Sequence, residues 1–380
     1  MSYSRFEDAL AKAVAERRIA GAVALVTDRD GALYEHAHGA RTAGQDVAMD
    51  AGTLFWIASM TKALVSVGAL KLVEAGKLTL DEDLARLIPE FADLQVLDGV
   101  DADGKPKVRP ARSPITLRRL LSHTSGFAYG FTSPDLLAWA TATGAADPSS
   151  GSRAAHKQPL VFDPGQDYIY GIGIDWAGVV IEAASGQRLD AYLAEHVTGP
   201  LGMADTGFKL SPDQAARAAS VHVRGPEGVM PIPFGLPPEP EVLPGGGGLY
   251  STAGDYGRFL RMLMGSGPQL LSEATLRELA TLQTAPGVGG FKSALPGMSH
   301  DYDPYPGMPT GYGLATLITP DPTGDGRRGG SLTWAGLANT YYWADPVDGR
   351  GGVLMTQLLP FADPEVLELF KALERDAYGV

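Results

Sequence analysis

The chain has 380 residues, more than the roughly 250–300 at which a single hydrophobic core usually stops growing, so we expect two lobes or more. Apolar residues make up 44% of it and charged residues 20%, which is typical of a folded globular protein. A formal net charge of −13 argues against a nucleic-acid or anionic-membrane surface, and the absence of cysteine excludes disulfides, thiolate catalysis and cysteine-based metal sites.

The sequence predicts no metal and no other cofactor. None of the seven histidines belongs to a His-Glu-x-x-His pair, so a zinc protease is not expected. The N-terminus lacks the basic end and apolar core of a signal peptide, and no stretch of about 18 apolar residues is present to span a membrane. We therefore expect a cytoplasmic protein with no nucleic-acid or membrane partner, and the sequence leaves its oligomeric state open.

The first predicted elements follow in the order helix, strand, strand, helix. Residues 5–18 carry apolar and charged positions at helical spacing. Residues 22–26 form a short apolar run typical of a buried strand, and the turn residues 28–31 precede a return strand that begins at Leu33. The apolar stretch 63–73 is too long for a typical strand and ends before a glycine, so it predicts a buried helix.

The rest of the chain alternates loops and helices before it turns to strands. Polar or Pro-, Gly- and Ser-rich stretches predict loops at 94–114, 145–165 and 225–247. Helices are expected near 115–121 and 175–194, and strands at 314–319, 340–344 and 353–359. Asp363 and Pro364 then open a final helix, with Asp363 as its N-cap. Strands at both ends with helices between them predict one sheet built from both termini and an inserted, mainly helical lobe.

Ser59 and Lys62 stand three residues apart at the start of the predicted buried helix. Helical geometry places residues i and i+3 on the same face. A serine hydroxyl is a weak nucleophile until a base takes its proton, and a lysine within hydrogen-bond reach can be that base. The helix N-terminus adds N–H groups and a positive dipole that suit a developing anion. Because the flanking residues are apolar and unpaired polar groups are costly to bury, we expect both side chains to face a pocket.

Two other serine-hydrolase arrangements fit the sequence less well. No serine lies in a complete Gly-x-Ser-x-Gly, so the nucleophile elbow of the α/β-hydrolases is missing. His123, in the run Ser-His-Thr-Ser-Gly at 122–126, suggests a Ser-His-Asp triad, but its position at a helix-to-loop transition favours a structural role. The chemistry therefore depends on Ser59 and Lys62.

Six segments form a specific ordered set across nearly the whole chain, at 54–62, 115–127, 163–170, 200–203, 246–253 and 334–336. In this combination the chain resembles the β-lactamase-related serine hydrolases, and most of all the family VIII carboxylesterases, which share the fold of class C β-lactamases. The resemblance implies an α+β, penicillin-binding-protein-like fold. Residues 1–78 and 245–380 would form the lobe with the antiparallel sheet and residues 79–244 the mainly helical lobe, with the active site between them.

The resemblance also implies the partners of the serine. A tyrosine that follows a Pro-Gly turn reaches the serine in this family, and Tyr170 occupies that position. Tyr168 is the alternative, but the spacing to Asp175 favours Tyr170. We interpret Asp175 itself as a residue at a helix start that supports the site. The family pattern further implies an oxyanion hole made by the backbone N–H groups of Ser59 and Leu337.

The pocket walls follow from the same resemblance. Trp334 and Gly336 lie where class C β-lactamases carry Lys-Thr-Gly, and the glycine would let substrate approach the backbone closely. Tyr129 and Phe131 would add further aromatic walls. The β-lactamase lysine is thus replaced by Trp334, and the asparagine of the β-lactamase tyrosine motif is replaced by Ile172. Two groups that recognise a β-lactam are therefore missing.

These departures predict a serine carboxylesterase that hydrolyses short-chain acyl esters through an acyl-enzyme on Ser59, with little or no β-lactamase activity. Its partner would be a small-molecule ester. Lys62 and Tyr170 would act together as the base, and the sequence does not decide which of them takes the proton first. The alternatives are an amide or D-amino-acid peptide hydrolase, an acyltransferase of the same fold, and an inactive relative that only binds ligands. The natural ester and the stereochemical preference stay open.

Overall fold

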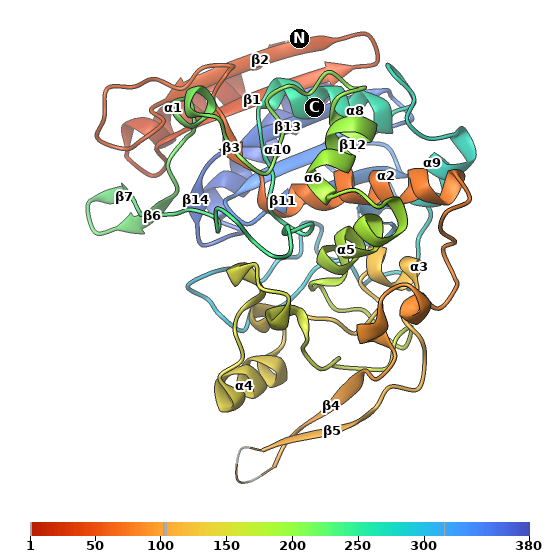
Figure 1. Ribbon diagram of the computed structural model, residues 1–380. Coiled ribbons are helices and arrows are strands. Elements are labelled where there is room, and N and C mark those ends of the chain that lie inside the picture. Colours follow the sequence, from red (N-terminus) through yellow and green to blue (C-terminus); the bar gives the residue numbers. More distant parts are fainter. Residues whose placement is uncertain (1, 102, 104, 315) are drawn as a thin grey trace.

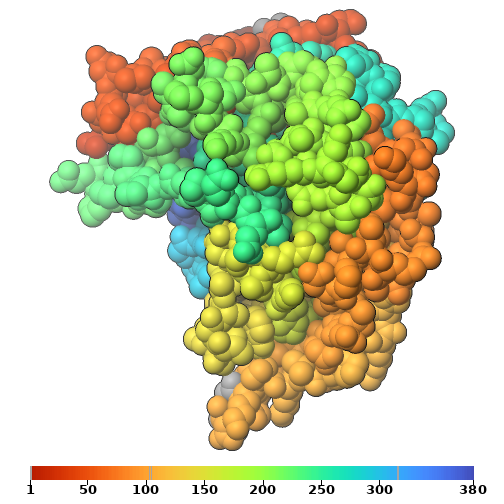
Figure 2. All heavy atoms as spheres, in the orientation of Figure 1, coloured from red at the N-terminus to blue at the C-terminus, as the bar shows by residue number. Residues whose placement is uncertain are grey.

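The computed structural model describes residues 2–101, 103, 105–314 and 316–380. Its upper part in Figure 1 holds the largest sheet and the N- and C-terminal segments, and its lower part holds mainly the orange to yellow segments that precede α5 (Gly173–Ser185) in the chain. In the space-filling view, the segment of β4 (Gln95–Val100) and β5 (Pro106–Pro110) forms the lower tip, well away from the N-terminal strands at the top (Figure 2). None of the described helices is both long and apolar enough to cross a membrane.

The largest sheet joins the two ends of the chain. Its seven strands have the order β2-β1-β13-β12-β11-β10-β9, and the neighbouring strands pair in antiparallel fashion. The strands are β1 (Gly21–Asp28), β2 (Ala32–Gly39), β9 (Gly311–Tyr312), β10 (Leu317–Thr319), β11 (Ser331–Gly336), β12 (Thr340–Asp345) and β13 (Arg350–Met355). Because β1 pairs with β13, the sheet is built from both termini, as the sequence predicted.

Helices cover both faces of this sheet. Side chains alternate between the two faces of a strand. On β12, Tyr341 packs against Phe370 of α10 (Pro364–Tyr378), whereas the next residue, Tyr342, packs against Tyr256 of α8 (Ala253–Leu263). Helix α1 (Ser4–Ala15) lies beside α10. The strand is therefore buried on both sides, which explains the run of apolar and aromatic residues at 341–344 without a polar face.

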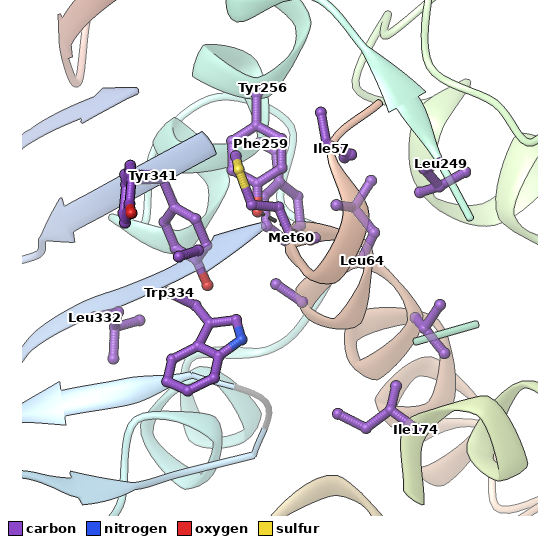
Figure 3. Close-up of a cluster of buried hydrophobic side chains, with 14 of the residues drawn as sticks. Ile57, Met60, Leu64, Ile174, Leu249, Tyr256, Phe259, Leu332, Trp334 and Tyr341 are labelled. Carbon is purple, nitrogen blue, oxygen red and sulfur yellow. Dashed lines mark hydrogen bonds between the residues drawn. The ribbon is translucent and has the colours of Figure 1, made fainter. Parts of the chain in front are cut away.

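Helix α2 (Thr61–Glu74) is the predicted buried helix, and it packs against α5 (Gly173–Ser185). Figure 3 shows apolar side chains between α2 and strands β11 and β12, among them Met60 and Trp334. The other helices are α3 (Leu117–Leu121), α4 (Pro134–Thr143), α6 (Leu189–Leu193), α7 (Pro212–Ala215) and α9 (Glu273–Leu279).

The structure differs from the sequence expectations at five places, the last of which is described in the next paragraph. The predicted loop at 94–114 contains the hairpin of β4 (Gln95–Val100) and β5 (Pro106–Pro110), with residues 102 and 104 outside the described part. The predicted helix at 175–194 is interrupted, because Gly186 ends α5 with φ 73°. Residue 315 of the strand expected at 314–319 lies outside the described residues, and β10 begins at residue 317. The strand expected at 353–359 is divided between β13 and β14 (Leu358–Leu359).

Strand β14 belongs to a second, three-stranded sheet with β6 (His222–Gly225) and β7 (Gly228–Pro231), so the loop expected at 225–247 also contains a strand. Two further short strands, β3 (Phe55–Trp56) and β8 (Tyr250–Ser251), pair with each other, and β3 lies directly before the segment that carries Ser59.

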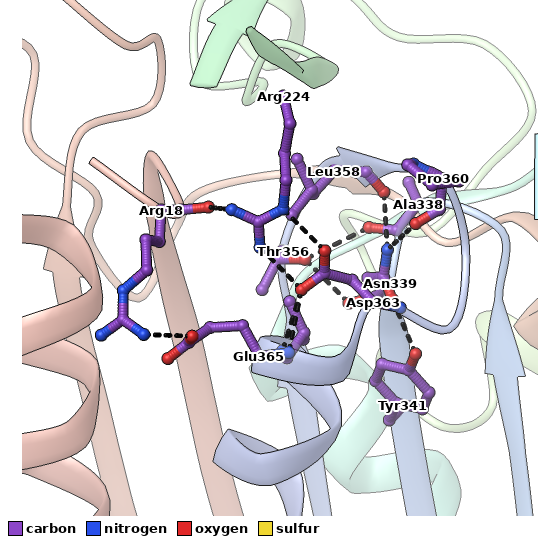
Figure 4. A network of polar contacts seen from close by, with 11 residues as sticks. Arg18, Arg224, Ala338, Asn339, Tyr341, Thr356, Leu358, Pro360, Asp363 and Glu365 are labelled. Atoms are coloured by element: carbon purple, nitrogen blue, oxygen red, sulfur yellow. Dashed lines mark hydrogen bonds and ion pairs between the residues drawn. The ribbon is translucent and has the colours of Figure 1, made fainter. Parts of the chain in front are cut away.

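A network of polar contacts holds the turn between β11 and β12 (Figure 4). Asn339 adopts φ 58°, a left-handed conformation that asparagine tolerates better than most residues. Its side chain donates to the carbonyls of Leu358 and Pro360, both at 2.8 Å, and accepts from the backbone N–H of Asp363 at 3.0 Å. Asp363 caps α10, as predicted, and pairs with Arg224 at 2.8 Å. The turn that contains Leu337 is thus tied to two other parts of the fold.

Candidate active site

Ser59 lies in a short 3-10 turn (Ala58–Met60) that leads directly into α2. The residue before it, Ala58, has φ 42°, which is uncommon for a residue with a Cβ. Backbone strain of this kind costs of order 1–3 kcal/mol and is concentrated at functional sites. Ser59 is partly exposed although Ala58 and Met60 on either side are buried. The fold therefore presents one hydroxyl from an otherwise buried segment.

Lys62 is completely buried, and its ammonium nitrogen has three oxygen neighbours. Nζ lies 3.2 Å from Oγ of Ser59, 3.0 Å from the hydroxyl of Tyr129 and 2.6 Å from the carbonyl oxygen of Gly246. The i and i+3 geometry predicted from the sequence thus brings the two side chains within hydrogen-bond reach. None of these three neighbours carries a formal charge.

The carboxylate of Asp175 is linked to Lys62 by hydrogen bonds through the Tyr129 hydroxyl. The Tyr129 hydroxyl donates to Oδ2 of Asp175 at 3.1 Å, and Oδ1 of Asp175 accepts the backbone N–H of Gly246 at 2.9 Å. Burial, and after it the charge of Asp175, raises the pKa of Tyr129 well above its ordinary value. Tyr129 was predicted as a pocket wall, which stays a prediction; the structure also places its hydroxyl within hydrogen-bond distance of Lys62.

Tyr170 lies just before α5, and its ring faces Lys62 with the centroid 4.8 Å from Nζ. Its hydroxyl accepts a hydrogen bond from the indole nitrogen of Trp334 at 3.2 Å. Thr132 connects the two tyrosines, because its hydroxyl donates to the carbonyl of Tyr170 at 2.7 Å and accepts the backbone N–H of Tyr129 at 3.3 Å. The predicted residues are therefore together, with Tyr170 bonded to Trp334 rather than to Lys62.

Gly336, at the end of β11, lies against the backbone that leads to Ser59. A Cβ at residue 336 would come within 2.2 Å of the carbonyl oxygen of Ile57 and 2.3 Å of Oγ1 of Thr340. Leu337 packs against a small apolar cluster that includes Ala58. Only glycine permits this approach. The two backbone N–H groups predicted for the oxyanion hole, those of Ser59 and Leu337, thus belong to adjoining segments; their role stays a prediction.

Aromatic rings surround these groups. Phe291 stacks on Tyr170 with centroids 5.3 Å apart and an angle of 10°, and it lies 5.7 Å from Phe131. Phe131 in turn stacks on Tyr129 at 5.2 Å. The predicted wall residue Phe131 is therefore beside the site, and Phe291 is a further neighbour that the sequence reasoning did not identify.

Two other candidates from the sequence have structural contacts. His123 is buried, and its Nδ1 accepts the backbone N–H of Gly171 at 3.3 Å. Burial, and after it the charge of Lys62, lowers the pKa of this histidine well below its usual value, so the imidazole is neutral at neutral pH. The Tyr168 hydroxyl donates to the carbonyl of Gly289 at 3.3 Å. These contacts fit the supporting role expected for His123 and the choice of Tyr170 over Tyr168.

Sequence reasoning missed the contact between Tyr129 and Lys62 and the part taken by Gly246. Asp175 carried a usable signal: it is a carboxylate 5% exposed within the apolar run of α5, and a buried carboxylate needs a partner. Among the described residues, no three His, Asp or Glu side chains are grouped so that they could hold a metal ion.

Comparison with known proteins agrees with this geometry. The family model described as Beta-lactamase matches residues 6–375. The chain belongs to the beta-lactamase family. It is 34% identical to monacolin J acid methylbutanoyltransferase of Aspergillus terreus, covering 98% of this chain and 95% of that protein, and 31% identical to lovastatin esterase of Penicillium rubens, covering 95% and 94%. It also resembles the solved structure of unliganded simvastatin synthase (LovD) from Aspergillus terreus, with a TM-score of 0.85, 31% identity and coverage of 99% and 98%.

Membership in the beta-lactamase family confirms the predicted α+β, penicillin-binding-protein-like fold. The relatives named above are an acyltransferase and an esterase, so the chain falls among the serine hydrolases and acyl-transfer enzymes of this family. The narrower resemblance to family VIII carboxylesterases has no counterpart in these matches.

Proposed function

We propose that the chain is a serine acyltransferase that moves an apolar acyl group from an ester or thioester donor to an alcohol. Ser59 Oγ attacks the acyl carbon as its proton passes to the base formed by Lys62 and Tyr170. The C–O or C–S bond to the donor then breaks, and the leaving group takes that proton. An alcohol repeats the attack on the acyl-enzyme and releases the new ester. Water in place of the alcohol gives the carboxylic acid.

The contact between Ser59 Oγ and Lys62 Nζ, at 3.2 Å, carries this proposal. It pairs a partly exposed nucleophile with a buried nitrogen at the start of a helix, where positive dipole favours the anion of an acyl-transfer intermediate. The acyltransferase at 34% identity supports transfer rather than plain hydrolysis. The aromatic rings of Phe131 and Phe291 beside the site support an apolar acyl group.

Hydrolysis is the second candidate, in the manner of a family VIII carboxylesterase. The lovastatin esterase favours hydrolysis, because it is 31% identical to this chain over nearly the full length of both proteins. Both reactions use the same acyl-enzyme and differ only in whether water or an alcohol takes the acyl group. The proportion of the two products therefore separates them.

The test uses p-nitrophenyl butyrate as donor, with and without 1-butanol as acceptor. Transfer predicts that 1-butanol diverts most of the acyl group into butyl butyrate at concentrations where butyrate otherwise forms. Hydrolysis alone predicts butyrate at every alcohol concentration. Ser59→Ala should lower p-nitrophenol release by about 10³-fold or more, since it removes the nucleophile.

Ser66→Ala is the matched control for Ser59→Ala. Ser66 lies in α2 about two turns after Ser59 and, unlike Ser59, is buried, and its substitution should leave turnover within about twofold of the unaltered chain. Ester turnover that survives in Ser59→Ala would contradict the role of the serine, whereas Ser59-dependent turnover without any butyl butyrate would favour the hydrolase.

A further inference from the structure

The hydrogen atoms around Lys62 can be counted from its three oxygen neighbours. A carbonyl oxygen only accepts, so Lys62 must donate to Gly246 across the 2.6 Å contact. The directions of the other two hydrogen bonds, to Tyr129 and to Ser59, decide what the nitrogen can do. A nitrogen that donates to Ser59 holds the hydroxyl in place, whereas a nitrogen that presents a lone pair can take its proton.

Asp175 fixes the direction of the bond between Tyr129 and Lys62. An ionised carboxylate has no hydrogen to give, so the single hydrogen of the Tyr129 hydroxyl goes to Oδ2 of Asp175 at 3.1 Å. The raised pKa of Tyr129 keeps that hydrogen in place at neutral pH. The Tyr129 oxygen is therefore left with its lone pairs toward Lys62, and Lys62 must donate to it.

To act as a base, Lys62 must give up one proton of its ammonium group, and the resulting amine has two hydrogens and one lone pair. Gly246 and Tyr129 take the two hydrogens, because both of them can only accept from Lys62. The lone pair is then left for the third neighbour, the hydroxyl of Ser59 at 3.2 Å. This is the arrangement in which the Ser59 proton can pass to Nζ while Oγ forms the bond to the acyl carbon.

The same carboxylate holds the second acceptor as well. Oδ1 of Asp175 accepts the backbone N–H of Gly246 at 2.9 Å, which fixes the peptide whose carbonyl receives Lys62. The space is tight, because a Cβ at residue 246 would lie 2.3 Å from Oδ2 of Asp175 and 2.8 Å from the hydroxyl of Tyr129. One buried carboxylate thus orders both groups that receive hydrogens from Lys62.

We propose that Asp175 is a positioning residue that acts through Tyr129 and Gly246, so that the lone pair that Lys62 has when it acts as a base points at Ser59. The inference rests on the proposed acyl transfer at Ser59 and adds to it the carboxylate that orients the base. Asp175 itself does not touch the reacting atoms. Its effect is therefore on the rate of acylation of Ser59, not on the binding of the acyl donor.

Asp175→Asn tests this directly, because asparagine has nearly the same size. Its amide oxygen can keep the Gly246 N–H, and its NH₂ then donates to the Tyr129 oxygen. The Tyr129 hydrogen turns toward Lys62 and occupies the lone pair. We expect kcat for p-nitrophenyl butyrate to fall about 10- to 100-fold with KM within about twofold, as for a misdirected catalytic group.

Tyr129→Phe is the second variant, and it leaves the bond between Asp175 and Gly246 intact. It removes the acceptor for one Lys62 hydrogen, so kcat should fall by a similar factor. Because the two residues act as one unit, the double variant should be little slower than either single variant. The melting temperature of each variant is measured alongside, to separate a change in stability from a change in rate.

Two control variants remove the same kinds of group, a buried carboxylate and a buried tyrosine hydroxyl, elsewhere in the fold. Asp255→Asn removes a buried carboxylate that accepts the backbone N–H of Asp205 at 2.8 Å, and Tyr192→Phe removes a buried hydroxyl that donates to the carbonyl of Gly68 at 3.1 Å. Neither touches Lys62, and both should keep kcat within about twofold.

A fluorophosphonate probe gives a readout that does not depend on the natural substrate. It reacts with the activated Ser59 hydroxyl, and intact mass measures the rate of labelling. Slow labelling in both Asp175→Asn and Tyr129→Phe supports the inference even if ester transfer fails, and that failure would then concern only the proposed function. Normal labelling in either variant would overturn it.

Discussion

The indole of Trp334 connects the sheet to the tyrosine of the site. It is 2% exposed on β11, its nitrogen donates to the Tyr170 hydroxyl, and its ring meets Tyr302 and Tyr312 edge-on. Class C β-lactamases carry a lysine at this position, so a charged group that would face substrate is replaced here by a buried donor that holds another side chain. We therefore expect Trp334 to affect both the orientation of Tyr170 and the choice of substrate.

Trp334→Phe should lower kcat about fivefold. The phenyl ring keeps most of the apolar packing, whereas the loss of the indole N–H removes one neutral hydrogen bond, which contributes about 1 kcal/mol. Steady-state turnover of p-nitrophenyl butyrate measures this effect. Trp343→Phe is the control, since Trp343 lies on the neighbouring strand with its ring against Phe370 of α10. Equal rates in Trp334→Phe and the unaltered chain would show that Tyr170 does not need this donor.

Nitrocefin turnover should be at least 10²-fold slower than ester turnover in the unaltered chain. The groups that would contact a β-lactam's carboxylate and side-chain amide are replaced by Trp334 and Ile172, both buried, and a missing hydrogen-bonding group in a polar pocket typically costs several kcal/mol of specificity. Parallel assays with nitrocefin and p-nitrophenyl butyrate compare kcat/KM for the two. Nitrocefin turnover that matches or exceeds ester turnover would contradict the assignment of esters, rather than β-lactams, as the substrate class.

At the scale of elements, the end of β11 and the turn before α2 lie so close that the backbone of each limits the position of the other. Gly336 makes this approach possible, and the Asn339 network holds the following turn. The segments that carry Ser59 and Leu337 are therefore positioned by backbone contacts rather than by long side chains. The geometry of any oxyanion hole here depends on that spacing.

Gly336→Ala should reduce kcat by about 10²-fold or more, because the new Cβ forces β11 away from Ile57 and displaces one of the two predicted oxyanion donors. Gly324→Ala is the control, since a Cβ at residue 324 would meet no atom within 4 Å. The rate of acylation by p-nitrophenyl butyrate measures the effect. An active Gly336→Ala enzyme would place the oxyanion donors elsewhere.

The elements that the sequence predicted are those that carry local signals. The apolar run of α2 and the Asp363-Pro364 start of α10 depend on neighbouring residues, and the structure has both. Tyr129 is different, because its partner Lys62 is 67 residues away and nothing near it in sequence marks that contact. Asp175 shows an intermediate case: its burial could be inferred from the apolar run around it, but its two partners could not.

At the scale of the whole molecule, ion pairs link segments that are distant in sequence. Arg118 of α3 pairs with Asp81 at 2.7 Å, Arg109 of β5 pairs with Asp163 at 2.9 Å, and Arg217 pairs with Asp205 at 2.5 Å. Asp81 and Asp205 are exposed or partly exposed, so each of these two pairs contributes little to stability, whereas Asp163 is buried. Their common property is that the arginine lowers the pKa of the carboxyl group in the folded state.

The stability of the folded chain should therefore fall as the solution is acidified below about pH 4, the ordinary range of aspartate in an unfolded chain. A carboxyl group whose pKa is lower when folded stabilises the fold above its unfolded pKa, and this contribution disappears as pH falls through the folded value. Asp255 and Glu182 act in the opposite direction, because burial raises the pKa of both. The groups with lowered pKa are more numerous: Asp28, Glu74, Asp81, Glu90, Asp163 and Asp205.

Urea unfolding at pH 6 and at pH 3 measures this dependence, and the midpoint should be lower at pH 3. Asp205→Asn should narrow the difference between the two midpoints, because the variant has already lost one group that titrates in this range while Arg217 keeps its other bond, to the carbonyl of Gly52. Since the loss comes from proton uptake by carboxylates, it should reverse on return to pH 6. A midpoint that stays constant or rises between pH 6 and pH 3 would mean that the buried carboxyls Asp255 and Glu182 outweigh the arginine-paired ones.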